Sequence, residues 1–181
     1  MRLPALVLAC ALLLAACGSG EASSFALIDP AEREPAPDVR AETLEGEELG
    51  LADLDGGPVL INFWASWCGP CIEEAPALRN IHDAYADEGL HVVGVNVRDR
   101  TSNARRFERE LGIPYPSWTD PAAEIAARFG GIGPAALPST LILDAEHRVA
   151  VRLFGAVTFA ELQGYVEPLL DEADPDRDAA S

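Results

Sequence analysis

The feature that most constrains the fold is a pair of cysteines, Cys68 and Cys71, at the junction of two sequence patterns. Residues 58–64 (PVLINFW) form a short apolar run rich in β-branched and aromatic side chains, which predicts a buried strand. Beyond the cysteines, the apolar residues of 78–85 recur at helical spacing. The pair therefore stands where a strand ends and a helix begins.

A second apolar run, residues 91–97 (HVVGVNV), follows this helix after Gly89, a residue typical of helix ends. A strand, a helix and another strand within about forty residues make a βαβ unit. Such a unit implies that the two strands are parallel and that the crossover is right-handed.

The rest of the domain predicts a mixed sheet. We expect a helix through 104–111 with arginines and glutamates on its outer face, a short strand at 117–118, a helix starting at Asp120-Pro121, and two short strands at 140–143 and 149–153. The turn between the last two strands is short, so they form an antiparallel hairpin. Thr158 and Glu161 form a capping box that opens a last helix, and Pro168 should distort or end its final turn. The sum is an α/β fold whose sheet is parallel in one half and antiparallel in the other.

The N-terminus has the pattern of an export signal. Residues 3–16 are apolar, but this run is shorter than the roughly 20 residues of a membrane-spanning helix. It closes with Leu14-Ala15-Ala16-Cys17, which resembles a bacterial lipobox, in which the cysteine is lipidated and becomes the new N-terminus. We therefore predict an extracytoplasmic protein anchored to a bacterial membrane through Cys17. An ordinary cleaved signal and an uncleaved anchor are the alternatives, and both would export the domain.

The organisation that follows has four parts. Residues 1–17 are the lipoprotein signal peptide, 18–37 a flexible tether rich in small residues and proline, 38–170 one domain, and 171–181 an acidic disordered tail. The chain has 30 acidic and 13 basic residues, a net charge of −17, which makes a nucleic-acid partner a poor expectation. All the basic residues are arginines, so lysine chemistry such as a Schiff base is excluded.

Once the signal is removed and Cys17 carries lipid, Cys68 and Cys71 are the cysteines left in the folded domain. A disulfide that closes so short a loop adds little to the stability of the fold, so the pair is predicted to be reactive rather than structural. The helix N-terminus stabilises a thiolate at Cys68, the attacking sulfur, and Cys71 resolves the mixed disulfide. We expect no metal, because zinc needs four ligands and the three histidines are scattered, and no cofactor beyond the redox-active disulfide.

At this point the sequence resembles a known family. Trp67-Cys68-Gly69-Pro70-Cys71 after a buried strand is the thioredoxin motif, and residues 63–76 resemble the membrane-tethered, extracytoplasmic thioredoxin-like proteins of the TlpA and ResA type. Their pattern CxxCxxExP is matched by Cys68, Cys71, Glu74 and Pro76. The resemblance covers about residues 38–170 and implies a thioredoxin fold with a strand–helix insert, here about 98–129.

The resemblance also implies a role for Glu74, one turn beyond Cys71. A partly desolvated carboxylate there would have a raised pKa, tune the thiols and pass protons during exchange. The alternative is a solvated surface glutamate. Thioredoxin itself has a buried aspartate six residues before its first cysteine, where this chain has Asn62, so the proposal depends more strongly on Glu74.

Substrate-binding residues follow from the same resemblance. Leu137-Pro138 matches the cis-proline that faces the cysteine pair in thioredoxin folds, where it keeps the neighbouring backbone open to a substrate strand. Trp67, with Gly69 and Pro70, would form an apolar platform for an unfolded substrate. Trp64 lies within the strand and is expected in the core.

The function implied is a thiol–disulfide oxidoreductase acting as a reductase, because Gly69-Pro70 is the dipeptide of reducing thioredoxin. Relatives of this type reduce apocytochrome c before haem attachment, or cysteines in copper-site assembly, and a membrane donor of the DsbD/CcdA kind would supply electrons. Three alternatives remain open: a disulfide-forming oxidase, a copper(I) metallochaperone and a peroxidase. The peroxidase is disfavoured, because Ile61 and Ala65 stand where the peroxiredoxin motif has a proline and a threonine or serine upstream of its cysteine.

Overall fold

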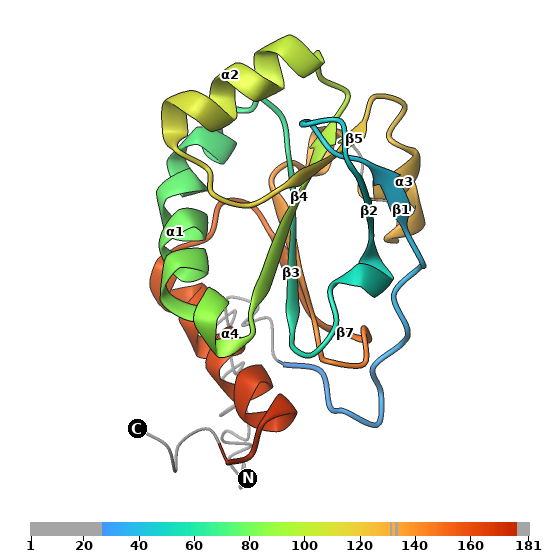
Figure 1. Cartoon of the computed structure of the whole chain (residues 1–181), viewed down its shortest axis with the longest axis vertical. Helices are drawn as coiled ribbons and strands as arrows, with labels where there is room; N and C mark the ends of the chain where they lie inside the picture. Colours follow the sequence, from blue (N-terminus) through green and yellow to red (C-terminus); the bar gives the residue numbers. More distant parts are fainter. Residues whose placement is uncertain (1–26, 131, 133, 177–181) are drawn as a thin grey trace, which may run out of the picture.

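A computed structural model describes residues 27–130, 132 and 134–176. Its centre is a five-stranded sheet (Figure 1). In spatial order the strands are β5 (Ser117–Asp120), β4 (His91–Val97), β3 (Val59–Trp64), β6 (Ser139–Leu143) and β7 (Val149–Phe154). β3, β4 and β5 are parallel, whereas β6 runs antiparallel to β3 and to β7. The predicted mixed sheet, with a parallel half and an antiparallel hairpin, is confirmed.

Helices cover both faces of this sheet (Figure 1). They are α1 (Gly69–Tyr85), α2 (Thr101–Leu111), α3 (Glu124–Arg128) and α4 (Phe159–Ala173), with 3-10 turns at Leu51–Asp53 (η1), Ala86–Glu88 (η2) and Pro134–Ala136 (η3). α1 and α4 lie on one face, and α3 lies on the other with a small N-terminal hairpin. None of the helices in the described part of the chain is long and apolar enough to cross a membrane.

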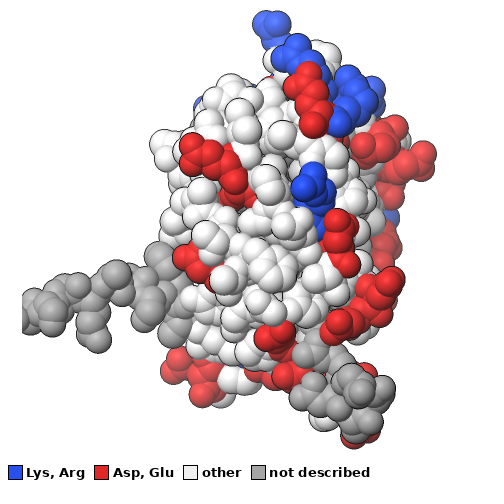
Figure 2. All heavy atoms as spheres, turned by 90° about the vertical axis from the view of Figure 1, so that its left-hand side faces the viewer, with Lys and Arg blue, Asp and Glu red and all other residues white. Residues whose placement is uncertain are grey.

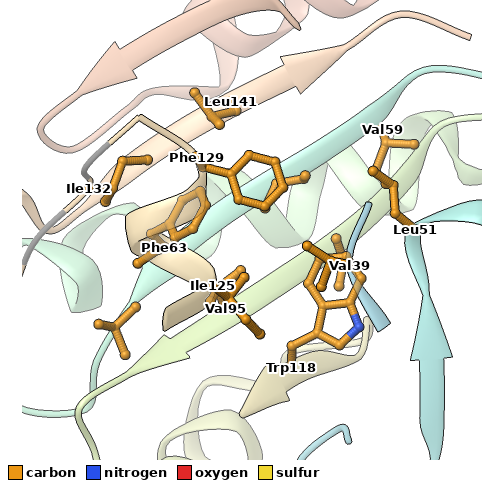
Figure 3. Close-up of a cluster of buried hydrophobic side chains, with 14 of the residues drawn as sticks. Val39, Leu51, Val59, Phe63, Val95, Trp118, Ile125, Phe129, Ile132 and Leu141 are labelled. Atoms are coloured by element: carbon orange, nitrogen blue, oxygen red, sulfur yellow. The ribbon is translucent and has the colours of Figure 1, made fainter. Parts of the chain in front are cut away.

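Each face of the sheet has its own core. On the side of α3, the rings of Phe63 and Phe129 meet edge to face with centroids 5.6 Å apart, and Trp118 is fully buried nearby (Figure 3). On the side of α1 and α4, the core is built of aliphatic residues from both helices and from the sheet, among them Leu60, Ile81, Ile142, Leu162 and Leu169. Every residue of β3 is buried, which fixes the strand that leads into the cysteine pair.

The N-terminal hairpin is the element that sequence reasoning missed. It consists of β1 (Arg40–Glu42) and β2 (Glu48–Gly50), each three residues long and largely polar. Tertiary contacts hold it: the Trp118 indole donates to the carbonyl of Leu49 at 2.9 Å, and the Leu44 amide donates to the carbonyl of Ser117. The hairpin therefore packs against β5, the edge strand of the sheet.

The boundaries of the domain differ from those expected. In the described part of the predicted tether, the Ile28 amide donates to Ala150, and the buried Arg33 side chain pairs with Asp144 at 3.2 Å and with Glu172 at 2.6 Å. These contacts make residues 27–37 part of the domain. Glu172 belongs to α4, so the acidic tail does not begin at 171. The predicted signal peptide, including Cys17, lies outside the described residues.

Three helix predictions were wrong in detail. α4 continues through Pro168 to Ala173, so this proline does not end the helix, although it removes one backbone hydrogen bond. α3 begins at Glu124 rather than at Asp120, whose carboxylate instead accepts the amides of Glu124 and Ala126. Glu108 does not lie on the outer face of α2 but is buried, with 8% of its surface exposed.

Candidate active site

Cys68 and Cys71 form a disulfide at the N-terminus of α1, with Sγ atoms 2.04 Å and Cα atoms 5.3 Å apart. Cys68 is the N-cap residue, and its Sγ accepts the Cys71 amide at 3.3 Å. The amides and the partial positive charge of the helix start therefore point at the first sulfur, which favours a thiolate there. Cys68 is the slightly more exposed of the two residues, at 5% against 2%, but both are buried.

The loop before the pair is held by the end of β4. The Ser66 amide donates to Asp99 Oδ2 at 2.6 Å, and the Trp67 indole donates to the carbonyl of Arg98 at 3.2 Å. Asn96 Nδ2 also donates to Asp99 Oδ2. Asp99 was missed because it belongs to no motif, although the carboxyl ends of the parallel strands β3 and β4 meet at one edge of the sheet and place it beside this loop.

Glu74 is buried beneath the pair, so it is not a solvated surface residue, with only 1% of its surface exposed. Asn62 Nδ2 donates to its Oε1 at 2.8 Å, and the Val157 amide donates to its Oε2 at 3.2 Å. Burial raises the pKa of Glu74 to about 7, although both hydrogen bonds act in the opposite direction. A carboxyl with this pKa can take up or release a proton near neutral pH. Asn62 thus occupies the place of thioredoxin's aspartate as a donor to the glutamate.

The segment that faces the pair comes from the start of β6. The Leu137–Pro138 peptide is cis, as the resemblance implied, and the carbonyl of Pro138 accepts the Gly155 amide at 2.9 Å. Leu137 packs against the cluster that holds Cys68 and Cys71. The structure therefore brings this segment to the cysteines across 66 residues or more of sequence.

The surface around the pair is apolar. Among the described residues, the large hydrophobic side chains that are exposed are Trp67 (54%), Ile72 (48%) and Phe154 (54%). Gly69 and Pro70 are exposed between the cysteines. Ile72 follows Cys71, and Phe154 pairs with Ser139 in the register of β6 and β7, next to Pro138. The face of the molecule over α1 is largely free of charge, whereas basic side chains gather at its upper margin and acidic ones along its right and lower margins (Figure 2).

Further aromatic residues lie in the buried surroundings of the pair. Trp64 is in the core as expected, and its ring stacks on Phe107 of α2 with centroids 4.5 Å apart. A small cavity of about 10 Å³ lies between Cys71, Asn62 and Tyr115. Within the residues described, no group of three or more histidine, cysteine, aspartate or glutamate side chains is placed to hold a metal ion.

Comparison with known proteins places this site in a family. Residues 33–152 match the model of the AhpC/TSA family, which is more than half of the chain. The chain belongs to the AhpC/TSA family. This AhpC/TSA member is 36% identical over 138 residues to the thiol:disulfide interchange protein HelX of Rhodobacter capsulatus, covering 75% of this chain and 74% of HelX. It is 31% identical to the thiol-disulfide oxidoreductase ResA of Geobacillus thermodenitrificans, covering 74% and 75% of the two chains.

Solved structures agree with these relatives. A secreted thiol-disulfide isomerase from Corynebacterium glutamicum superimposes with a TM-score of 0.77 at 33% identity, covering 84% of this chain and 95% of that one. A DsbF homologue from Corynebacterium diphtheriae gives a TM-score of 0.75 at 34% identity, covering 83% and 96%. This AhpC/TSA member therefore has the thioredoxin-like fold and is a thiol–disulfide oxidoreductase, as the cysteine pair predicts.

Proposed function

We propose that the protein is a lipid-anchored reductase of disulfides in exported proteins. The observation that carries the proposal is the Cys68–Cys71 pair at the start of α1, above a buried Glu74 whose pKa is raised to about 7. Gly69-Pro70 between the cysteines favours the reducing direction. The ResA and HelX relatives support the same class of reaction.

The reaction proceeds in two exchanges. The Cys68 thiolate attacks one sulfur of a substrate disulfide, whose S–S bond breaks and releases a substrate thiolate that takes a proton from solvent. Cys71 then loses its proton and attacks Cys68 Sγ, which breaks the mixed disulfide and releases the second substrate thiol. Two electrons pass from the pair to the substrate, and Cys68–Cys71 is left oxidised. Glu74 acts as the acid–base group: it accepts the proton that Cys71 loses and returns it to the departing substrate thiolate, which leaves as a thiol.

The apolar platform of Trp67, Ile72 and Phe154 suits an unfolded substrate, because it binds through shape and apolar area rather than charge. Suitable substrates are apocytochrome c before haem attachment or the cysteines of a copper site under assembly. The oxidised pair is then reduced again by a membrane donor of the DsbD/CcdA kind. Secreted structural neighbours support an extracytoplasmic location.

The equilibrium reduction potential of Cys68–Cys71 tests the direction of the reaction. Trp64 packs in the cluster around the pair and Trp67 precedes it, so tryptophan fluorescence should report the redox state. A potential near that of thioredoxin, about −270 mV, is expected for a reductase. A value near that of DsbA, about −120 mV, would make the protein an oxidase instead.

The anchor needs a separate experiment. Metabolic labelling with radioactive palmitate should mark the protein and place it in the membrane fraction. Cys17→Ala should lose both label and membrane association, while Cys10→Ala should lose neither. An unlabelled protein secreted into the medium would show an ordinary cleaved signal.

A further inference from the structure

A second site lies beside α2, along the part of the helix that carries Glu108 together with Arg105 and Arg109. A cavity of about 710 Å³ opens between the turn of the β1–β2 hairpin, the second half of α2 and residues 112–116, which return the chain to β5. This volume falls within the range of about 300–1,000 Å³ that takes ligands of drug size. Its walls include Leu49, Ile113, Pro114 and Tyr115. The cavity is therefore large and mainly apolar.

Glu108 of α2 lines this cavity and is not fully satisfied. Only 8% of its surface is exposed, and its Oε1 atom is buried without a hydrogen-bond partner in the described part of the chain. The other contact of its carboxylate is a hydrogen bond from the Ser117 side chain. A buried carboxylate oxygen without a partner costs stability, and a donor supplied from outside would remove that cost.

The charges around the cavity favour a cationic donor. Glu45, Glu47 and Glu48 of the hairpin line it together with Glu108, against two arginines, Arg105 and Arg109. The Nε atom of Arg105 is already engaged with the carbonyl of Leu44. A guanidinium fits this setting better than an ammonium, because it is more weakly hydrated and enters apolar surroundings at lower cost.

We propose that this cavity is a second docking site, which receives an arginine side chain of a partner polypeptide, flanked by apolar residues, against Glu108 Oε1. The choice of a polypeptide rests on the proposed function, since the substrates and the electron donor of such a reductase are proteins. It also rests on position, because Ile113 and Tyr115 line both this cavity and the small one beside Cys71. A segment bound here lies close to the redox pair without occupying the cis-proline surface.

The test is a calorimetric titration of the oxidised full chain with the blocked tripeptide Ac-Leu-Arg-Leu-NH2. Binding with a Kd below about 1 mM is expected, with Ac-Leu-Gln-Leu-NH2 at least tenfold weaker because it lacks the cation. Glu108→Gln should weaken the arginine peptide at least tenfold. Glu110→Gln, which removes the same charge from the exposed face of the same helix, is the matched control and should bind like the wild type. Amide resonances of Ile113 and Tyr115 should shift with the peptide.

The outcomes separate clearly. Absence of binding, equal binding of both peptides, or a folded Glu108→Gln that binds like the wild type would overturn the proposal. If Nα-acetylarginine amide binds as tightly as the tripeptide, the site takes a free cation and the polypeptide assignment falls. Should Glu108→Gln fail to fold, the exposed double variant Glu45→Gln/Glu48→Gln must weaken binding at least threefold. Insulin reduction, measured separately, tests the redox activity, so failure of one proposal is distinct from failure of the other.

Discussion

Glu74 and Glu108 are two buried glutamates that differ in how their carboxylates are satisfied. Burial raises the pKa of each to about 7. Glu74 receives one donor on each oxygen, from Asn62 and from the Val157 amide, and lies in a closed interior. Glu108 has an oxygen without a partner and faces an open cavity of about 710 Å³. The same raised pKa thus arises at a completed site, where both carboxylate oxygens have a hydrogen-bond donor, and at an incomplete site, where one oxygen has none.

The difference teaches that a shifted pKa does not by itself tell what a carboxyl is for. Glu74 is held by donors from β3 and from the chain beyond β7, and it lies on α1 one turn beyond Cys71. Glu108 has a buried acceptor oxygen without a partner beside the cavity, so a donor bound there could satisfy it. Both act on Tyr115, whose hydroxyl pKa is raised first by burial and then by the two glutamates.

The largest expected effect is on disulfide reduction, which should depend on the cysteine pair and not on the cavity beside Glu108. Cys68→Ser should reduce insulin-disulfide turnover at least about a thousandfold, because no other described group can form the mixed disulfide. It should leave the affinity for the arginine tripeptide unchanged, since Glu108 and its cavity are untouched. Cys71→Ser is the matched variant: it should also stop turnover but accumulate a mixed disulfide, visible by mass spectrometry. Turnover retained by Cys68→Ser would refute the mechanism.

The next effect concerns stability and compares the glutamates directly. A carboxyl whose pKa is raised from 4.5 to about 7 on folding stabilises the fold fully below pH 4.5, and this stabilisation is lost as the pH rises through 7. The loss is about 3 kcal/mol for each glutamate. Glu108→Gln should therefore make the protein more stable than the wild type at high pH by about this amount. The variant keeps its hydrogen bond, because the Ser117 hydroxyl can donate to an amide oxygen as well as to a carboxylate.

Glu74→Gln should gain less stability at high pH than Glu108→Gln. Both neighbours of Glu74 are donors, so the amide must turn its own N–H groups toward one of them, which costs about 1–3 kcal/mol. Urea unfolding at pH 4.5 and pH 8 measures both free energies. A pH slope identical to that of the wild type in either variant would show that the glutamate in question titrates normally.

The third effect is on rate. Glu74→Gln should slow reduction about tenfold at pH 7 and remove the inflection near this pH from the rate profile, because the Cys71 proton loses its acceptor. Glu73→Gln, the exposed neighbour on the same helix, should keep both the rate and the inflection. A Glu74→Gln enzyme with the wild-type pH profile would show that Glu74 serves only packing.

Much of this arrangement could be predicted from the sequence. The elements that were predictable all have a strong local sequence signal. β3 and β4 are uninterrupted apolar runs, and the β6–β7 hairpin has a short turn between two such runs. The cysteine pair and Glu74 form a motif at fixed spacing. The β1–β2 hairpin could not be predicted, because its strands are three residues long and Trp118, far along the chain, holds them.

Glu108 could have been found. Ala104 and Glu108 are four residues apart on α2, on the same face as Phe107, and Ala104 is fully buried. We expected Glu108 on the outer face because its side chain is polar, whereas its helical spacing from Ala104 places it on the inner face. Asp99 gave no such signal, since it stands after a strand without any periodic pattern, and only the pairing of β3 with β4 brings it to Ser66.

The smallest effect tests the one internal donor that Glu108 has. Ser117→Ala removes the hydroxyl that lowers the pKa of Glu108 and that accepts the Trp64 indole at 3.3 Å, so the fold should lose about 1 kcal/mol and the Glu108 pKa should rise further. Thr140→Val is the matched change at the other site, because Thr140 reaches Glu74 only through Asn62. Carboxyl 13C titration by NMR should therefore show a clear shift for Glu108 and a smaller one for Glu74. Equal shifts would mean that burial alone sets both pKa values, and the contrast between a completed and an incomplete site would not stand.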